Sequence, residues 1–204
     1  MRAADNKRIA CRSSPGRKKT MASLARVGTR PQIAEVANLA REIWEEHYVP
    51  IIGPEQVAYM LGKFQSAKAI AAQLAGGYEY YTASHQGKIE GYVAVVPDQD
   101  NGTAMLSKIY VRKSARGHGF GRAMLEFAEA LCRERGIRAL WLTVNKNNRS
   151  SLAWYKRLGF KNAGSIIQDI GGGFVMDDYR LEKTIGQPGQ SSAAGEGLKS
   201  APGP

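Results

Sequence analysis

The chain has 204 residues, 43% of them hydrophobic, enough to bury the core of one domain with extensions. Its net charge of +11 is concentrated at the start, because residues 1–30 hold nine Lys and Arg against one acid. From residue 31 onward the net charge is only +3, which argues against a nucleic-acid-binding domain. No apolar run is long enough to span a membrane. We therefore expect no membrane partner, and nucleic-acid contact only through the basic tail.

Both ends of the chain are poor in bulky apolar residues. Residues 1–22 and 185–204 cannot offset their ordering entropy, so we expect disordered tails around a domain at 23–184. The basic start shows no clear amphipathic helix and is read as a tail rather than as an organelle transit peptide. Cys11 and Cys132 provide neither a disulfide framework nor metal-ligand spacing. We expect reduced thiols, no metal site and a cytoplasmic location.

The first half of the domain begins with a short strand at 24–27 and a helix from 33 to 48 that ends before Pro50. Further helices are predicted from Pro54 and over 67–74. Two β-rich runs around a turn at Gln86-Gly87 then predict a hairpin. One face of the first helix carries three carboxylates, which form either a solvated face or an acidic wall for a cationic substrate: Glu42, Glu45 and Glu46.

The second half reads as alternating strands and helices. A strand at 104–111, a helix at 120–135 and a buried strand at 139–144 predict a right-handed crossover between parallel strands. A short helix at 149–158, capped by Asn148, precedes two strands at 161–169 and 174–181. The chain therefore predicts a single α/β domain, with a mixed sheet of six or seven strands flanked by helices.

The stretch 108–124, KIYVRKSARGHGFGRAM, joins the central strand to the following helix through three alternating glycines. Such glycines let several backbone N–H groups point at one ligand, and the uncapped helix start adds its dipole, so the loop predicts a phosphate site. A Walker A loop requires Gly-Lys-Ser/Thr, but Gly121 precedes Arg122-Ala123, and a GxGxxG fingerprint fails as well. The remaining pattern is RxxGxG at Arg116, Gly119 and Gly121.

This loop, in this position, resembles the acetyl-CoA loop of the GCN5-related N-acetyltransferase (GNAT) superfamily. A second stretch, NNRSSLAWYKRLGF, resembles the second cofactor-side motif of that superfamily at Asn148, Ala153, Tyr155, Gly159 and Phe160. The similarity covers roughly residues 24–183, judged by eye. The stretch EIWEEHYVPIIGPEQVAYML is more loosely similar to the polyamine acetyltransferase branch. The resemblance implies a GNAT fold and an acetyl-CoA-dependent N-acetyltransferase.

The resemblance also implies roles for individual residues. The pyrophosphate of acetyl-CoA would lie on loop N–H groups, and the pantetheine arm would pair like an added strand with the end of the central strand, where a splayed gap leaves backbone groups unpaired. Asn148 would be a cofactor contact, the helix cap, or both, while Arg116 and Arg122 would add charge or be solvated. The implied cofactor-binding set is Ile109, Tyr110, Val111, Arg116, Gly117, His118, Gly119, Phe120, Gly121, Arg122 and Asn148.

The chemistry implied is attack of a neutral amine on a thioester, which needs a base, an oxyanion donor and an acid for the leaving thiolate. Tyr155 is the expected acid, although its spacing also fits a core aromatic. Ser107 and Lys108 stand where many relatives have a glutamate, so the base is left open among Glu45, Glu46, His47, Glu90 and Asp178.

The acceptor is expected to be a primary amine. The acidic helix face makes a polyamine the first expectation and a peptide N-terminus the second. A non-catalytic acyl-CoA-binding regulator, with a tail that contacts nucleic acid, is the alternative from another class. The oligomeric state, a homodimer included, stays open.

Overall fold

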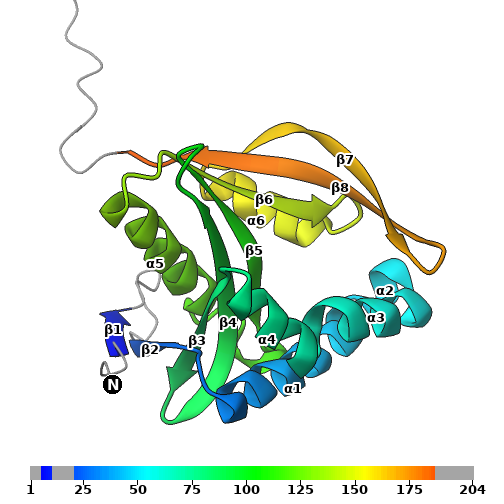
Figure 1. The fold of residues 1–204 in the computed structure, drawn as a ribbon, viewed down its shortest axis with the longest axis horizontal. Helices are drawn as coiled ribbons and strands as arrows, with labels where there is room; N and C mark the ends of the chain where they lie inside the picture. The colour runs from blue at the N-terminus through cyan, green and yellow to red at the C-terminus, as the bar shows by residue number, and fades with distance from the viewer. Residues whose placement is uncertain (1–5, 11–20, 187–204) are drawn as a thin grey trace, which may run out of the picture.

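The computed structural model describes residues 6–10 and 21–186, and within the first range it gives the backbone alone. One mixed sheet forms the centre, in the order β1-β2-β3-β4-β5-β6-β8-β7 (Figure 1). Its strands are β1 Asn6–Ala10, β2 Met21–Arg26, β3 Glu79–His85, β4 Lys88–Asp98, β5 Thr103–Val111, β6 Ala139–Asn145, β7 Lys161–Gly171 and β8 Phe174–Thr184.

Helices cover both faces of this sheet, so the predicted α/β fold is confirmed. The α1, α3 and α4 group lies on one face, and α5 and α6 lie on the other (Figure 1). The helices are α1 Arg30–His47, α2 Val49–Ile52, α3 Pro54–Met60, a π-helical turn η1 Leu61–Gln65, α4 Ala67–Ala75, a 3₁₀ turn η2 Lys113–Ala115, α5 Phe120–Glu134 and α6 Arg149–Arg157. No helix in the described part of the chain is long and apolar enough to cross a membrane.

Each face of the sheet buries its own core. Apolar side chains of α5 and α6 pack against one face around Met124, Leu140 and Leu142. On the other face, α1 and α4 pack against Tyr80 and Tyr92 through Val36, Ile43 and Ile70. Thr29 begins α1 with a complete capping box to Gln32, which fixes the start of this wall. The sheet is therefore a rigid platform with a distinct surface on each side.

The parallel pair β5–β6 is held together at one end only. Its paired residues run from Thr103–Ala139 to Met105–Trp141, and beyond Met105 the two strands diverge. The predicted parallel crossover and the predicted gap between these strands are both confirmed. The edge of β5 that faces β6 therefore has no partner strand from Ser107 to Val111.

A β-bulge in β5 accompanies this divergence. Val95 of β4 lies opposite Leu106 and Ala94 lies opposite Lys108, so Ser107 is an extra residue in β5. Bulges bend a strand and increase its local twist. The extra residue lies two positions beyond Met105, the last residue of β5 that pairs with β6.

The β7–β8 hairpin reaches back over the helices of the opposite face (Figure 1). The hydroxyl of Tyr59 donates to the carbonyl oxygen of Ile170 at 2.6 Å, and Gln56 Nε2 donates to that of Val175 at 3.1 Å. The turn contains Gly172, where an added Cβ would lie 2.8 Å from the Tyr59 ring. This contact joins the hairpin to α3 and closes one end of the space between them.

Several boundaries differ from the predictions. Ile185, expected in the C-terminal tail, is 5% exposed and belongs to the core that packs against α5. Pro50 does not simply stop a helix, because it lies in the first turn of the short α2. Asn6–Ala10 and Met21–Ala22 belong to strands, although 1–22 was assigned to a disordered tail. Pairing with the exposed edge of β2 forms this strand, and hydrophobic pattern does not report such pairing. The tails at 1–5, 11–20 and 187–204, with Cys11, lie outside the described residues.

Candidate active site

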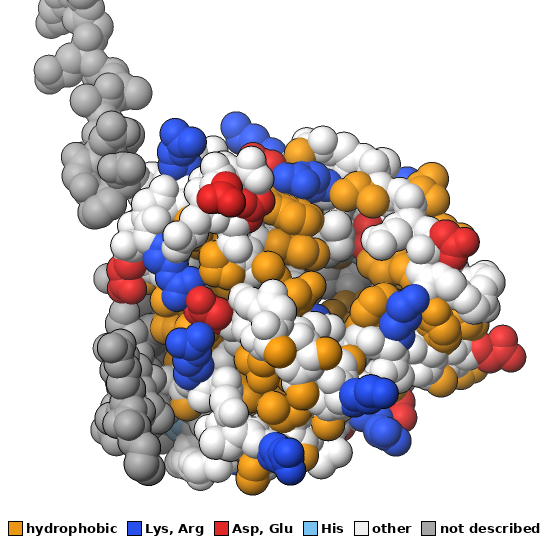
Figure 2. Space-filling model, in the orientation of Figure 1, with side chains coloured by type: hydrophobic (Ala, Val, Ile, Leu, Met, Phe, Trp, Pro, Cys, Tyr) orange, Lys and Arg blue, Asp and Glu red, His pale blue; other side chains and the backbone are white. Residues whose placement is uncertain are grey.

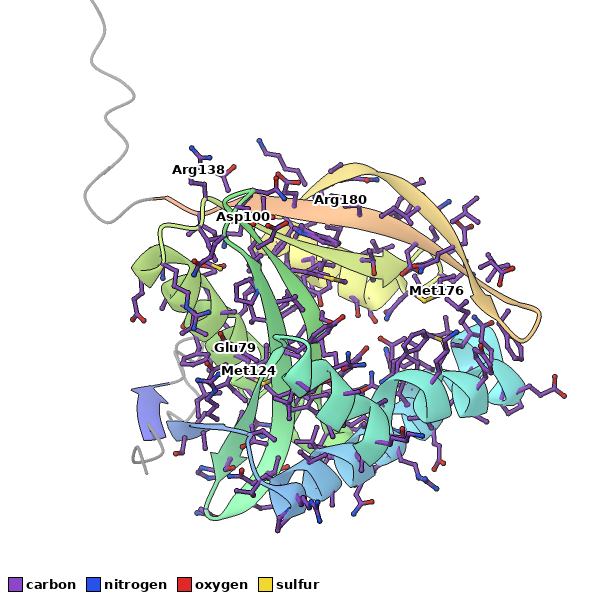
Figure 3. All side chains as sticks on the ribbon, in the orientation of Figure 1. Glu79, Asp100, Met124, Arg138, Met176 and Arg180 are labelled. Atoms are coloured by element: carbon purple, nitrogen blue, oxygen red, sulfur yellow. The ribbon has the colours of Figure 1, made fainter. Side chains whose placement is uncertain are left out.

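A cleft of about 930 Å³ opens where β5 and β6 diverge. Figure 2 shows a hollow near the centre of the face viewed, with hydrophobic side chains around it. Its walls come from α1, α3, η1 and α4 on one side, and from the 115–122 loop and α6 on the other. Met176 of β8 lies between the hairpin and the helices and lines its outer end (Figure 3). The cleft is thus a passage between the two faces of the sheet.

The glycine loop forms one side of the cleft. Gly117 and Gly119 have φ of +79° and +90°, a region that side-chain-bearing residues rarely adopt. No side chain caps the start of α5, so the N–H groups of its first turn are available at the cleft wall. At Gly121 an added Cβ would lie 3.3 Å from the Trp154 ring, so glycine lets α5 approach α6. These features fit a bound phosphate group.

The side chains of the loop are directed elsewhere. Arg116 donates from Nε to the Val111 carbonyl at 3.1 Å, and its Nη1 lies 3.4 Å from His47 Nδ1. Arg122 is exposed and pairs with Glu126 at 3.0 Å, while the exposed His118 ring lies against the Arg116 carbonyl. The backbone therefore forms most of this wall, and Arg116 braces the loop against strand β5.

Tyr155 lies on the inner wall beside the loop. It is 8% exposed, packs edge-on against Trp154 and Phe160, and lines the cleft. Burial, with a smaller contribution from nearby Tyr48, raises the pKa of Tyr155 far above its usual value. Burial likewise raises the pKa of Tyr48 to about 12. Both phenols therefore keep their protons at neutral pH and can act as donors.

His47, from the end of α1, connects the two walls. Its Nδ1 faces Arg116, and its Nε2 lies 3.4 Å from Nδ2 of Asn148. Burial and the Arg116 charge lower the pKa of His47, while Glu46 opposes them. Asn148, 2% exposed, also caps α6 by accepting from the Ser151 N–H at 3.2 Å. Asn148 is therefore a cap and a brace, and it is not part of the cleft lining.

Among the described residues that line the cleft, Asp178 of β8 is the one with a carboxylate side chain. It is 5% exposed and lies opposite Asn145 in the β6–β8 ladder. Burial is the main cause of the raised pKa of Asp178, and a hydrogen bond from Thr143 opposes it. A raised pKa makes this carboxylate a stronger base than an exposed aspartate.

Lys108 of β5 also lines the cleft and is only 6% exposed. Its Nζ lies 5.4 Å and 5.6 Å from the ring centroids of Tyr78 and Tyr80, and 3.3 Å from Ser107 Oγ. Burial lowers the pKa of Lys108 to about 8. A buried ammonium thus stands on the central strand of the sheet.

Comparison with known proteins agrees with this geometry. Residues 36–160 match the model of the acetyltransferase (GNAT) family. The chain belongs to this family. It is therefore an acetyl-CoA-dependent N-acetyltransferase, with acetyl-CoA as co-substrate, and the predicted superfamily is confirmed.

Several GNAT proteins are similar to this chain. An uncharacterised N-acetyltransferase of Lactobacillus delbrueckii subsp. lactis is 27% identical over 75% of the chain and 92% of that protein. The ribosomal protein bS18-alanine N-acetyltransferase of Escherichia coli K12 is 31% identical, over 48% of the chain and 65% of that enzyme. The structure of PaiA N-acetyltransferase from Thermoplasma acidophilum in complex with coenzyme A shares the fold, with a TM-score of 0.63, 20% identity, and coverage of 79% and 99%.

The predicted residues of this GNAT protein fall into three groups. His118 and Asn148 are not among the described residues that line the cleft. Ten line the cleft: Ile109, Tyr110, Val111, Arg116, Gly117, Gly119, Phe120, Gly121, Arg122 and Tyr155. Glu42, Glu45 and Glu46 are exposed and outside the described lining; Glu42 pairs with Arg112, and Glu46 pairs with Lys113 at 3.0 Å. The geometry does not support an acidic wall, because basic residues before the loop already occupy two of these carboxylates.

The sequence reasoning missed two features of the GNAT cleft. It did not foresee the contacts of His47 with Arg116 and Asn148, because these residues come from three separate segments. It noted Lys108 only as a replacement for a glutamate. The signal available was a lone lysine within a strand predicted to be central and apolar. Of the five candidate bases, His47 and Asp178 line the cleft, whereas Glu90 lies 3.5 Å from Arg112.

Proposed function

We propose that this GNAT enzyme acetylates a primary amine by direct attack on acetyl-CoA, with Tyr155 as the acid. The observation that carries the proposal is that buried Tyr155 and the glycine loop share one wall of the cleft. The pyrophosphate would lie on the N–H groups of Gly117–Arg122, and the pantetheine arm along Ile109–Val111, where β5 has no partner strand. We call this side, with α5 and α6, the donor half, and the side formed by α1–α4, η1 and β7–β8 the acceptor half.

The proton transfers and bond changes of the reaction indicate which residues take the remaining roles. An ammonium substrate must first lose a proton, and we propose Asp178 as its acceptor, directly or through water, because it is the carboxylate of the described lining. The neutral nitrogen then bonds to the thioester carbon, the C–S bond breaks, and Tyr155 gives its proton to the departing sulfur. After the C–N bond has formed, the nitrogen loses a second proton, which replaces the one that Tyr155 gave to the sulfur. His47 is less suited to the base role because burial and, less strongly, the Arg116 charge disfavour its charged form.

Acetyl-CoA turnover with a panel of amines tests the function. The panel holds polyamines, amino acids, aminoglycosides and peptides, and release of the CoA thiol is followed. We expect turnover above the hydrolysis rate for at least one class. A protein that binds acetyl-CoA but releases thiol with none of them would instead be a non-catalytic acyl-CoA-binding regulator.

The N-terminal amine of a protein is the second candidate acceptor. The supporting observation is the similarity to the bS18-alanine N-acetyltransferase over 48% of the chain. Peptides with different first residues, assayed beside free amino acids, separate the two candidates. Polyamines are less favoured than the sequence indicated, because the described cleft lining holds three cationic side chains and one carboxylate: Lys108, Arg116, Arg122 and Asp178.

A further inference from the structure

Lys108 is a buried residue of the acceptor half, and the role that we assign to it rests on the proposed function. Lys108 projects from β5 on the face that carries Tyr92 and Tyr110, because Ala94 lies opposite Lys108 and Tyr92 opposite Tyr110 in the β4–β5 ladder. This is the face of α1 and α4, across the sheet from α5. The lysine is therefore a group of the acceptor half, separate from the phosphate loop.

No carboxylate among the described residues pairs with Lys108. Its described contacts are Ser107 Oγ and the faces of Tyr78 and Tyr80. Desolvation is the cause of its lowered pKa, and no neighbouring acid counteracts it. An ammonium has three N–H donors, and one hydroxyl at 3.3 Å satisfies at most one of them. A buried charge left without an anion is unfavourable, so the site lacks a partner that a ligand can supply.

The walls around Lys108 are aromatic or apolar rather than acidic. Trp44, Tyr48, Ile52, Met60 and Phe64 line the same cleft as the lysine, and we call them the aromatic channel. Four glutamines of the acceptor half line the cleft, and three of them are engaged with the protein. Tyr80 donates to Gln73 Oε1, Tyr92 donates to Gln65 Oε1, and Gln56 donates to the Val175 carbonyl. Among its described lining residues, the acceptor half thus combines apolar walls with one buried cation, Lys108, and one carboxylate, the proposed base Asp178 of β8.

We propose that Lys108 binds a carboxylate of the acceptor, so that the substrate is an amine with an apolar body and an anionic group. The acceptor carboxylate forms the ion pair that the protein omits, and its apolar body lies along the aromatic channel. Lys108 is a specificity residue in this arrangement and does not exchange protons with the reacting nitrogen.

The experiment compares amines that differ only in a carboxylate. The pairs are phenylalanine with 2-phenylethylamine, leucine with 3-methylbutylamine, and 5-aminopentanoate with butylamine. For at least one pair we expect the acid to have a kcat/KM about 10- to 100-fold higher, the range of one charge-assisted hydrogen bond. Lys108→Met should remove this preference by raising KM for the acid, with the matched amine unchanged within about threefold.

Two controls accompany this variant. Lys88→Met removes an exposed lysine at the start of β4 and should leave every pair unchanged. Lys108→Gln removes the charge but keeps a polar side chain, and serves if Lys108→Met does not fold. A proton-transfer role would instead lower kcat equally for both members of a pair, and that result would overturn the proposal. Acetylation of Lys108 itself, detected by mass spectrometry after incubation with acetyl-CoA, would overturn it as well.

A binding measurement separates this inference from the proposed function. Calorimetry of the enzyme saturated with CoA, titrated with N-acetylphenylalanine, N-acetylleucine and 5-acetamidopentanoate and with the acetamides of the matched amines, requires no turnover. Tighter binding of at least one acid, lost in Lys108→Met, supports the anion site even if the acyl transfer fails. Equal binding of acid and neutral acetamide in every pair would refute the anion site even if the enzyme acetylates amines.

Discussion

The donor and acceptor halves of the cleft are built by different means. The donor half consists mainly of backbone: two glycines at positive φ, an uncapped helix start and an unpaired strand edge. The acceptor half consists mainly of side chains from five helical segments and a hairpin that α3 holds in place. A backbone site suits a ligand shared by a whole family, whereas a side-chain site can change with each substrate. Substitutions in the two halves should therefore change different kinetic parameters.

The largest effect is expected in the donor half. Gly119→Val places a branched side chain at φ +90° and disturbs the N–H groups at the start of α5. We expect KM for acetyl-CoA to rise by roughly 10³-fold, as for the loss of two charge-assisted hydrogen bonds. Gly77→Val is the matched control, because Gly77 has φ +91° but lies outside the described lining. If both variants bind acetyl-CoA equally well, the loop is not the phosphate site.

The next effect lies where the two halves meet. Tyr155→Phe removes the proposed proton donor while keeping the buried ring, so kcat should fall by roughly 10²-fold with little change in KM for acetyl-CoA. Tyr81→Phe, in the α5 core but outside the described cleft lining, loses a hydroxyl bonded to Glu79 and serves as the control. Steady-state kinetics suffice, and a Tyr155→Phe enzyme with full kcat would remove the phenol from the mechanism.

A smaller effect is expected for Asp178→Asn. The proposed base must be ionised, and burial raises the pKa of Asp178, so the wild-type rate should fall as the pH drops through that raised pKa. The variant should lose roughly tenfold or more in kcat/KM and should also lose this acidic limb. A pH–rate profile that keeps its acidic limb in Asp178→Asn would assign the base to another group, with His47 as the first candidate.

The last predicted effect is on folding stability rather than on rate. The pKa of Lys108 is about 8 in the folded protein, against 10.5 in the unfolded chain. Below pH 8, burial of the charged lysine therefore lowers the free energy of unfolding by roughly 3 kcal/mol. This penalty is relieved as the pH rises from 8 to 10.5. Lys108→Met should therefore be more stable than the wild type at pH 7, and the difference should shrink across that window. Urea unfolding at several pH values measures it, and a constant difference would contradict it.

The two halves also differ in how far the sequence predicts them. The RxxGxG pattern, Asn148 and the glycine-rich turn before β8 are local signals, because positive φ, capping and tight turns depend on residues close in the chain. Through the resemblance to GNAT proteins, these signals predicted the fold, the gap between β5 and β6, and a role for Tyr155, which lines the cleft. The acidic face of α1 misled, since Glu42 and Glu46 face basic residues about 70 positions away. Such long-range pairing leaves no periodic pattern in the sequence.

At the bulge, β5 contains one more residue than the segment of β4 with which it pairs. Adjacent residues of β4, Ala94 and Val95, are matched by residues of β5 that are two positions apart, Lys108 and Leu106. The surplus residue, Ser107, lies on the cleft lining just past the last β5–β6 pair. Removing Ser107 would restore an even ladder and take away the bend at the mouth of the gap. The shape of the cleft in which we propose that the two substrates meet therefore depends on one additional residue in β5.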